Sequence, residues 1–258
     1  MAQQRTLAEE LERFVRDQAS LYGEVISYVP GKPERSAPPV PMGAVTDVAV
    51  GSAPVAYLES LNAKLTIHQS EAWMSATTLD ELAASIQGCQ KCALGATRNK
   101  LVFGVGNPQA KGMLIGEAPG ADEDLKGEPF VGKAGQLLNK MIEAINLKRE
   151  DVYIANILKS RPPNNRDPKP EEVEACEPYL WKQISIIKPK VILCLGRIAG
   201  TNLLKRQETL GKMRGQTFDF HGVQVIVTYH PAALLRNPDW KHGAWEDLKR
   251  FKEIYDSV

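Results

Sequence analysis

Two rhythms of apolar and polar positions alternate along this chain of 258 residues. Short, uninterrupted apolar runs occur at 113–115, 152–158 and 191–195, the segment 217–230 predicts two further strands, and another strand with a turn is predicted at 101–108. Such runs are typical of strands that are buried on both faces of a parallel sheet. The segments between them carry apolar residues at helical spacing, which predicts amphipathic helices.

These helical patterns cover 77–89, 134–147, 171–189, 197–204 and 239–255. The first begins with a Thr and Asp helix start, and the third has acidic residues in its first turn, where they complement the helix dipole. Strands that alternate with helices indicate an α/β protein. We therefore predict a three-layer α/β/α sandwich around a central, mainly parallel sheet of four to five strands.

The first 77 residues have a different composition. Apolar residues at helical spacing over 6–22 predict an N-terminal helical extension within 1–28, and a stretch rich in Pro, Ala and Gly predicts a linker over 29–77. Residues 55–78 are ambiguous and also fit a short helix. We place the main domain at 78–258 and expect deletion of 1–76 to leave its activity intact. The extension is a loosely docked segment or a binding element for an unknown protein.

Charge and hydropathy narrow the class of protein. Residues 1–80 carry 6 basic and 10 acidic side chains, which leaves 26 basic and 21 acidic side chains in the remainder. A mildly basic body suits a polyanionic partner but does not require one. No apolar run reaches the roughly 18 residues of a membrane span, so we expect no membrane contact. The charged start does not resemble a signal peptide, so we expect a cytoplasmic protein.

The stretch 113–132 carries the first chemical signal. A short strand runs into a turn built from Gly116, Ala118, Pro119 and Gly120, and a second glycine-bracketed loop follows with Phe130 at its tip. Glycine lets a ligand approach the main chain closely, and loops after strands hold the ligands of open α/β sheets. An ordinary βα turn with an acidic, solvated helix start explains the same residues equally well.

Polar side chains follow three of the predicted strands and so share one edge of the sheet. The first strand is followed by Gly116 and Glu117 and then by the loop that carries Phe130. The second is followed by Asn156, Lys159, Arg161, Asn165 and Arg166, and the last by His230. A lone histidine after a strand is more often a structural hydrogen-bond partner, and an asparagine there is usually a turn former. Together, an aromatic ring, an amide and a histidine suit a pocket for a flipped base. The basic residues beside prolines suit phosphate contacts.

Three motifs carry a family resemblance. The segments GEAPGADEDLKGEPFVGKAGQLL, VYIANILKSRPPNNRDP and TYHPAALLR resemble the family 4 uracil-DNA glycosylases, the bacterial and archaeal iron–sulfur type. The resemblance extends over residues 80–258 and does not include the first 78. It implies a monofunctional enzyme of base excision repair that removes uracil from single- or double-stranded DNA in the bacterial cytoplasm.

The resemblance also assigns roles to residues. It implies that Phe130 stacks on uracil, that Asn156 pairs with the Watson–Crick edge of uracil, and that His230 stabilises negative charge on O2 as the base leaves. Glu117 and the backbone of Gly116 and Ala118 are implied to lie beside the sugar and the attacking water.

Two assignments in the matching motifs are less direct. Both Asn165 and Glu117 are candidates for holding the attacking water. The segment after the histidine is implied to enter the minor groove, with Leu234 and Leu235 as an apolar wedge beside Arg236. No lysine nucleophile is needed, so we expect no lyase step.

The cofactor is where the chain departs from the family. The resemblance implies a [4Fe–4S] cluster on four cysteines, and Cys89, Cys92 and Cys176 match three of them, whereas Ser160 occupies the fourth position. A serine alkoxide is a poorer iron ligand than a thiolate. Three interpretations remain: a [4Fe–4S] cluster held by three cysteines with Ser160 or another ligand, a damaged or absent cluster, and recruitment of Cys194 as the fourth ligand. Zinc on the three cysteines is a further possibility.

Three other functions are alternatives to uracil excision: two are enzymes with another outcome or substrate, and one is a binding protein without catalysis. A relative that stays covalently attached to the abasic site would carry a histidine in a basic insertion before the last motif, and 203–215 has none. A binding protein without catalysis would not need a uracil pocket. A family 5 relative with a wider substrate range would lack the glutamate at position 117. We expect a monomer.

Overall fold

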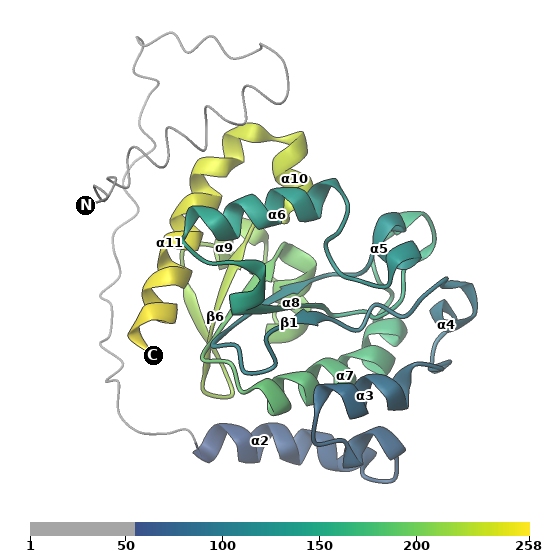
Figure 1. Ribbon diagram of the computed structural model, residues 1–258. Helices are drawn as coiled ribbons and strands as arrows, with labels where there is room; N and C mark the ends of the chain where they lie inside the picture. The colour runs from purple at the N-terminus through teal and green to yellow at the C-terminus, as the bar shows by residue number, and fades with distance from the viewer. Residues whose placement is uncertain (1–54) are drawn as a thin grey trace, which may run out of the picture. The chain divides into compact units, whose positions relative to one another are not determined.

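A six-stranded sheet forms the centre of the protein in the computed structural model, which describes residues 55–258 (Figure 1). The predicted 1–28 extension and the first part of the predicted linker lie outside the described residues. The strands are β1 (Val105–Gly106), β2 (Gly112–Gly116), β3 (Val152–Asn156), β4 (Val191–Leu195), β5 (Thr217–Phe220) and β6 (Val223–Thr228). Their order across the sheet is β1-β3-β2-β4-β6-β5.

The four central strands run parallel, as predicted. Every residue of β2, β3 and β4 is buried, which explains their uninterrupted apolar sequences. The two edge strands are antiparallel to their neighbours. The sheet has six strands, where we predicted four to five, because both short edge strands, β1 and β5, pair with the four central strands.

Helices cover both faces of this sheet (Figure 1). The α-helices are α2 (Val55–Leu65), α3 (Leu79–Ile86), α4 (Leu94–Thr97), α5 (Ala121–Lys126), α6 (Lys133–Ala144), α7 (Pro170–Ile187), α8 (Arg197–Leu204), α9 (Leu210–Met213), α10 (Pro231–Arg236) and α11 (Lys241–Ser257). Short 3-10 helices are η1 (Thr66–His68), η2 (Ala72–Ser75), η3 (Arg149–Asp151), η4 (Pro163–Asn165) and η5 (Pro238–Trp240).

The alternation of side chains along the strands separates two layers. Met113, Ile115 and Cys194 share one hydrophobic cluster with residues of α2, α3, α7 and α8. The opposite face packs against α11, since a side chain added at Gly112 would meet the ring of Phe251 at 2.8 Å. The α/β/α sandwich is therefore confirmed. None of the described helices combines the length and the apolar character needed to span a bilayer.

Residues 55–77 belong to the folded body, which differs from the predicted boundary at 78. Leu61 and Leu65 on α2 and Trp73 on η2 are buried in the main core, and the Trp73 ring meets that of Tyr179 edge-on at 5.1 Å. The described residues 55–258 fall within one compact unit. The sequence pattern does not predict this packing, because α2 is short and the residues around it have the composition of a linker. The predicted start of α3 is present, with Thr78 and Glu81 forming a capping box.

This packing predicts different results for two truncations. Deletion of residues 1–54 should leave the thermal unfolding midpoint unchanged, because it removes none of the described core. Deletion of 1–76 should lower stability by on the order of 5 kcal/mol or more, since it removes three large buried side chains. Calorimetry of both proteins checks this. Equal midpoints would show that residues 55–76 contribute nothing to the fold.

Candidate functional site

The carboxyl ends of the parallel strands gather the predicted site residues. The register of β2 and β3 sets Gly116 beside Asn156, and β6 ends two residues before His230. At the end of β4, Gly196 has a φ of +95°, and a side chain there would come within 3.0 Å of the Cβ of His230. The three strand exits therefore meet, as the sequence predicted.

Gly116 is the point of closest approach in this site. A Cβ added there would lie 2.3 Å from Oδ1 of Asn156 and 2.6 Å from Cζ of Phe130. Real Cβ atoms do not tolerate such contacts, so only glycine allows the amide and the ring to converge above this strand end. The reason for glycine at this position is thus steric.

Asn156 presents a buried amide without a hydrogen-bond partner for its oxygen. The residue is 2% exposed, and its Oδ1 has no partner among the described residues. Buried acceptors are almost always paired, and an unpaired one costs about 1–3 kcal/mol. An orphaned acceptor at a strand exit is therefore a sign of a ligand that donates a hydrogen bond.

The loop that carries Phe130 is held by two side chains, Glu123 and Arg149. Its backbone is in the left-handed region, with a φ of +53°, which is a strained conformation for an aromatic residue. Oε1 of Glu123 accepts from the backbone N–H groups of Val131 and Gly132 at 2.9 and 3.0 Å. Nη1 of Arg149 donates to the carbonyl of Phe130 at 3.3 Å. Glu123 and Arg149 are supporting residues that sequence reasoning missed.

His230 faces Phe130 and has a defined tautomer. The ring centroids are 5.6 Å apart. Nδ1 of His230 accepts from the backbone N–H of Ala232 at 3.1 Å, so a neutral imidazole carries its proton on Nε2. Burial lowers the pKa of His230 to about 4, and the nearby Arg236 charge contributes. The ring is therefore a neutral hydrogen-bond donor at physiological pH.

A buried tether fixes the strand that leads to His230. The hydroxyl of Thr228 donates to Oδ2 of Asp247 on α11 at 2.8 Å. The same carboxylate accepts from Nε of Arg214 at 2.7 Å, and Nη1 of Arg214 donates to the Tyr229 hydroxyl at 2.8 Å. These hydrogen bonds fix the two residues that precede His230 in the chain.

Glu117 follows directly after β2 and has an unusual carboxyl group. Burial first, and then the charge of Asp167, raise the pKa of Glu117 to about 7, while the charge of Arg197 opposes them. Arg197 pairs with Asp167, with 3.7 Å between Nη2 and Oδ2. A carboxylate that titrates near neutrality is suited to proton transfer. No sequence pattern indicates that Asp167 and Arg197 act on Glu117.

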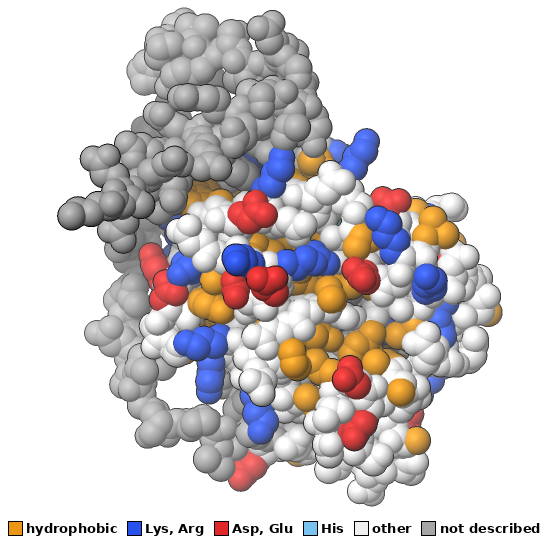
Figure 2. Space-filling view, viewed as in Figure 1, with side chains coloured by type: hydrophobic (Ala, Val, Ile, Leu, Met, Phe, Trp, Pro, Cys, Tyr) orange, Lys and Arg blue, Asp and Glu red, His pale blue; other side chains and the backbone are white. Residues whose placement is uncertain are grey.

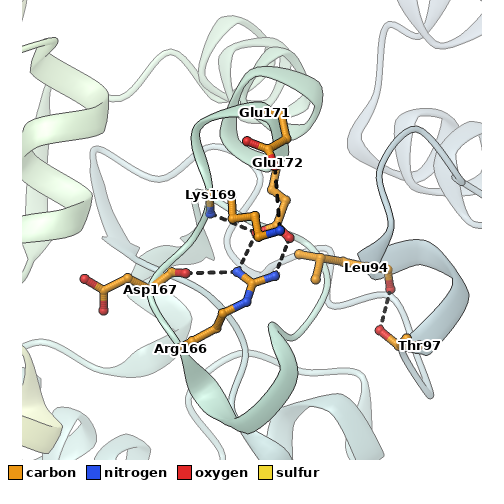
Figure 3. Close-up of polar contacts among 7 residues, drawn as sticks. All are labelled: Leu94, Thr97, Arg166, Asp167, Lys169, Glu171 and Glu172. Carbon is orange, nitrogen blue, oxygen red and sulfur yellow. Dashed lines mark hydrogen bonds and ion pairs between the residues drawn. The ribbon is translucent and has the colours of Figure 1, made fainter.

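The predicted phosphate-binding arginines are engaged with the protein itself. Figure 3 shows Arg166 held between the carbonyl of Asp167 and the carboxylate of Glu172. Its Nη2 lies 2.6 Å from Oε1 of Glu172, and this pair raises the pKa of Arg166 and lowers that of Glu172. Nε of Arg161 donates to Oδ1 of the exposed Asn165 at 2.8 Å. Both arginines therefore order the proline-rich loop.

Two predicted DNA contacts are corrected by their burial. Lys159 is 1% exposed, and its ammonium donates to protein acceptors, so it cannot reach a phosphate. Leu234 is also buried, because the wedge segment is the helix α10, which packs against α6. Of the predicted wedge, Leu235 is partly exposed, and Arg236 beside it is exposed.

A separate cavity collects the predicted cluster ligands. Cys89, Cys92, Cys176 and Ser160 all line it. The backbone N–H of Lys159 donates to Sγ of Cys176 at 3.2 Å, which is the kind of bond that stabilises a ligating sulfur. Four possible metal-ligating side chains around one cavity are compatible with a cluster of several metal ions.

The other readings of the cysteines fit less well. Within residues 55–258 no three His, Cys, Asp or Glu side chains converge closely enough to hold a single metal ion, whereas zinc requires its ligands around one point. Cys194 pairs with Ile115 in the middle of the sheet and does not line the cavity. Recruitment of Cys194 is therefore excluded by its position.

Charges on the visible surface are mixed. Figure 2 shows Lys and Arg side chains interleaved with Asp and Glu over this face. The basic excess of the body therefore does not form one continuous patch there.

Comparison with known proteins identifies the family of this chain. The model of the uracil DNA glycosylase superfamily matches residues 103–249. The type-4 uracil-DNA glycosylase of Archaeoglobus fulgidus is 48% identical and covers 69% of this chain and 93% of its own length. The corresponding proteins of Saccharolobus solfataricus and Pyrobaculum aerophilum are 47% and 46% identical, over 69% and 67% of this chain and 87% and 92% of their own lengths.

The fold and the site thus define a member of the uracil DNA glycosylase superfamily, and within it the chain belongs to the type-4 uracil-DNA glycosylases.

The environment of His230 predicts its titration. Because burial lowers the pKa to about 4, the ring should stay neutral, with its proton on Nε2, throughout the range from pH 5 to 8. NMR of the imidazole nitrogens, with His230→Gln used to assign the signal, measures this directly. Protonation near pH 6.5, the ordinary histidine value, would contradict the assigned environment.

Proposed function

We propose that this protein is a monofunctional glycosylase that flips uracil out of DNA and hydrolyses its N-glycosidic bond. The unpaired Oδ1 of Asn156 carries the proposal. Uracil has an N–H at position 3 beside carbonyl oxygens, whereas cytosine has an unprotonated N3 and an amine. The oxygen of a fixed amide accepts from the uracil N–H, which no group of cytosine at that position can replace.

The surrounding residues support base flipping and bond cleavage. Phe130 offers a ring for stacking and Gly116 leaves room for the base. Nε2–H of His230 donates to O2 of uracil and gains strength as negative charge develops there, while a neutral ring requires no proton release. The bond breaks toward an oxocarbenium-like sugar and a uracil anion.

Glu117 is our choice for holding the attacking water. Its carboxylate accepts a proton from water as the oxygen bonds to the sugar carbon, and a pKa of about 7 suits that transfer. The oxygen of Asn165 accepts from Arg161, so we assign Asn165 the role of ordering the loop. The backbone of Ala118 lies in the same turn as Glu117.

DNA contact on this proposal centres on α10. Leu235 enters the minor groove beside the flipped nucleotide, and Arg236 contacts a phosphate. Both single- and double-stranded DNA are substrates, because the pocket reads one base. We further propose that the protein acts as a monomer in the bacterial cytoplasm.

We also propose a [4Fe–4S] cluster in the cysteine cavity. Cys89, Cys92 and Cys176 would each supply a thiolate, with Ser160 at the fourth position. Support comes from the shared cavity and from the N–H group directed at Cys176. When bound, the cluster would supply iron–thiolate bonds that join the segment before α4 to α7.

Asn156→Asp tests the central proposal. A carboxylate keeps an acceptor but loses the amide donor, so uracil excision should fall by a factor of about 10² or more and selectivity against cytosine should weaken. Single-turnover rates on oligonucleotides with one uracil or one cytosine measure both effects. An unchanged rate and selectivity would remove Asn156 from the pocket.

The pKa of Glu117 predicts a pH profile. Because the carboxylate must be ionised to accept a proton, the excision rate should rise between pH 6 and 8 with a midpoint near 7. Glu117→Gln should be slow and flat across this range.

The same variant has a stability signature. The pKa of Glu117 in the folded state, about 7, exceeds the ordinary value of 4.5. The stability of the wild-type protein therefore falls as the pH rises from about 4.5 to about 7. Glu117→Gln lacks this loss and should unfold at a higher temperature than wild type at pH 8. A variant that keeps the pH-dependent rate would rule out Glu117 as the base.

Ser160→Cys tests the cofactor. If the cavity holds a cluster with a weak fourth ligand, this change should raise the iron retained per chain after exposure to air, because a thiolate binds iron more firmly than a serine oxygen. Iron analysis and visible absorption of both proteins, purified without oxygen, give the result. Iron absent from both would refute the cluster.

A further inference from the structure

Lys159 is a buried cation with neutral partners. Its ammonium donates to the backbone carbonyl of Asn156 at 2.9 Å and to Oε1 of Gln183 at 2.6 Å, and these are its partners among the described residues. Burying a charged group is expensive unless its hydrogen bonds are satisfied. A lysine retained at such a cost points to a role in the site.

The first partner is the residue that carries the base-reading amide. Asn156 is the last residue of β3. Beyond it, the backbone N–H groups of Ile157 and Leu158 donate to the carbonyls of Gly116 and Glu117 at 3.0 Å each. The Lys159 ammonium therefore holds the peptide of Asn156 from the side opposite to the β2 turn.

The second partner connects Lys159 to a rigid helix. Gln183 is fully buried on α7, and its Nε2 donates to the carbonyl of Phe103 at 2.9 Å. The same helix carries Cys176, whose sulfur accepts from the backbone N–H of Lys159 at 3.2 Å. Side chain and backbone of Lys159 are thus both fastened to α7.

We propose that Lys159 is a positioning residue that fixes the Asn156 peptide against α7, so that the amide is held ready for the base. This inference rests on the proposed function, since it assigns the amide to uracil. The role replaces the phosphate contact expected from the sequence. Positioning matters because a site that is misplaced by about 1 Å loses on the order of 10²-fold in rate.

The test compares Lys159→Met and Gln183→Leu with the exposed Lys212→Met as a matched control. Methionine keeps most of the buried volume and removes the donors. Single-turnover excision of uracil is measured over a range of enzyme concentrations. We expect the saturating rate of Lys159→Met to fall at least tenfold, the half-saturating concentration to change less than twofold, and the control to match wild type.

Non-additivity provides a second readout. If Lys159 and Gln183 act through one network, the double variant should be no slower than the slower single variant. An unchanged saturating rate in Lys159→Met would overturn the proposal. So would a loss confined to the half-saturating concentration, which is the pattern of a phosphate contact. If Lys159→Met does not fold, an unchanged saturating rate in Gln183→Leu would overturn it.

A third readout does not depend on activity. The side-chain amide of Asn156 gives its own ¹⁵N NMR signal, which should broaden or shift in Lys159→Met and remain in place in Lys212→Met. An unchanged signal would overturn the positioning role whatever the rates. A wild-type protein that released no uracil while this signal still responded to Lys159 would instead count against the proposed function.

Discussion

The parallel pairing of β2 with β3 is the constraint on which the site depends. Its register places Gly116 beside Asn156, and the missing side chain at Gly116 lets an amide and an aromatic ring share the space above the strand end. A shift of one residue would turn every side chain of β3 to the opposite face of the sheet.

Desolvation then sets the chemistry of the groups gathered there. Burial leaves the oxygen of Asn156 without a partner, keeps the imidazole of His230 neutral and moves the pKa of Glu117 to about 7. At neutral pH the unpaired oxygen of Asn156 and the buried carboxyl group of Glu117 reduce the stability of the free protein. A ligand that donates to the amide and accepts from the imidazole would recover part of that cost, which is how a buried polar site selects one base over another.

How far the sequence predicts this structure depends on the residue. Uninterrupted apolar runs predicted the parallel strands, and strand exits predicted that Gly116, Asn156 and His230 meet. The prediction that Lys159 contacts DNA came from its residue type, and that for Leu234 came from the family resemblance. Both are wrong because the two side chains are buried. Their burial depends on α7 and α6, which are distant in sequence. Asp167 and Arg197 likewise act on Glu117 through space, and no spacing reveals that effect.

The most direct test is release of uracil by the wild-type protein from a single-stranded and a U:G oligonucleotide, followed by alkali. The protein is purified without oxygen and its iron is recorded in the same session. Release of free uracil with strand cutting that requires alkali is the predicted result, because hydrolysis leaves an abasic site without a lyase step. Tight binding of the oligonucleotide with no release of base would contradict the account.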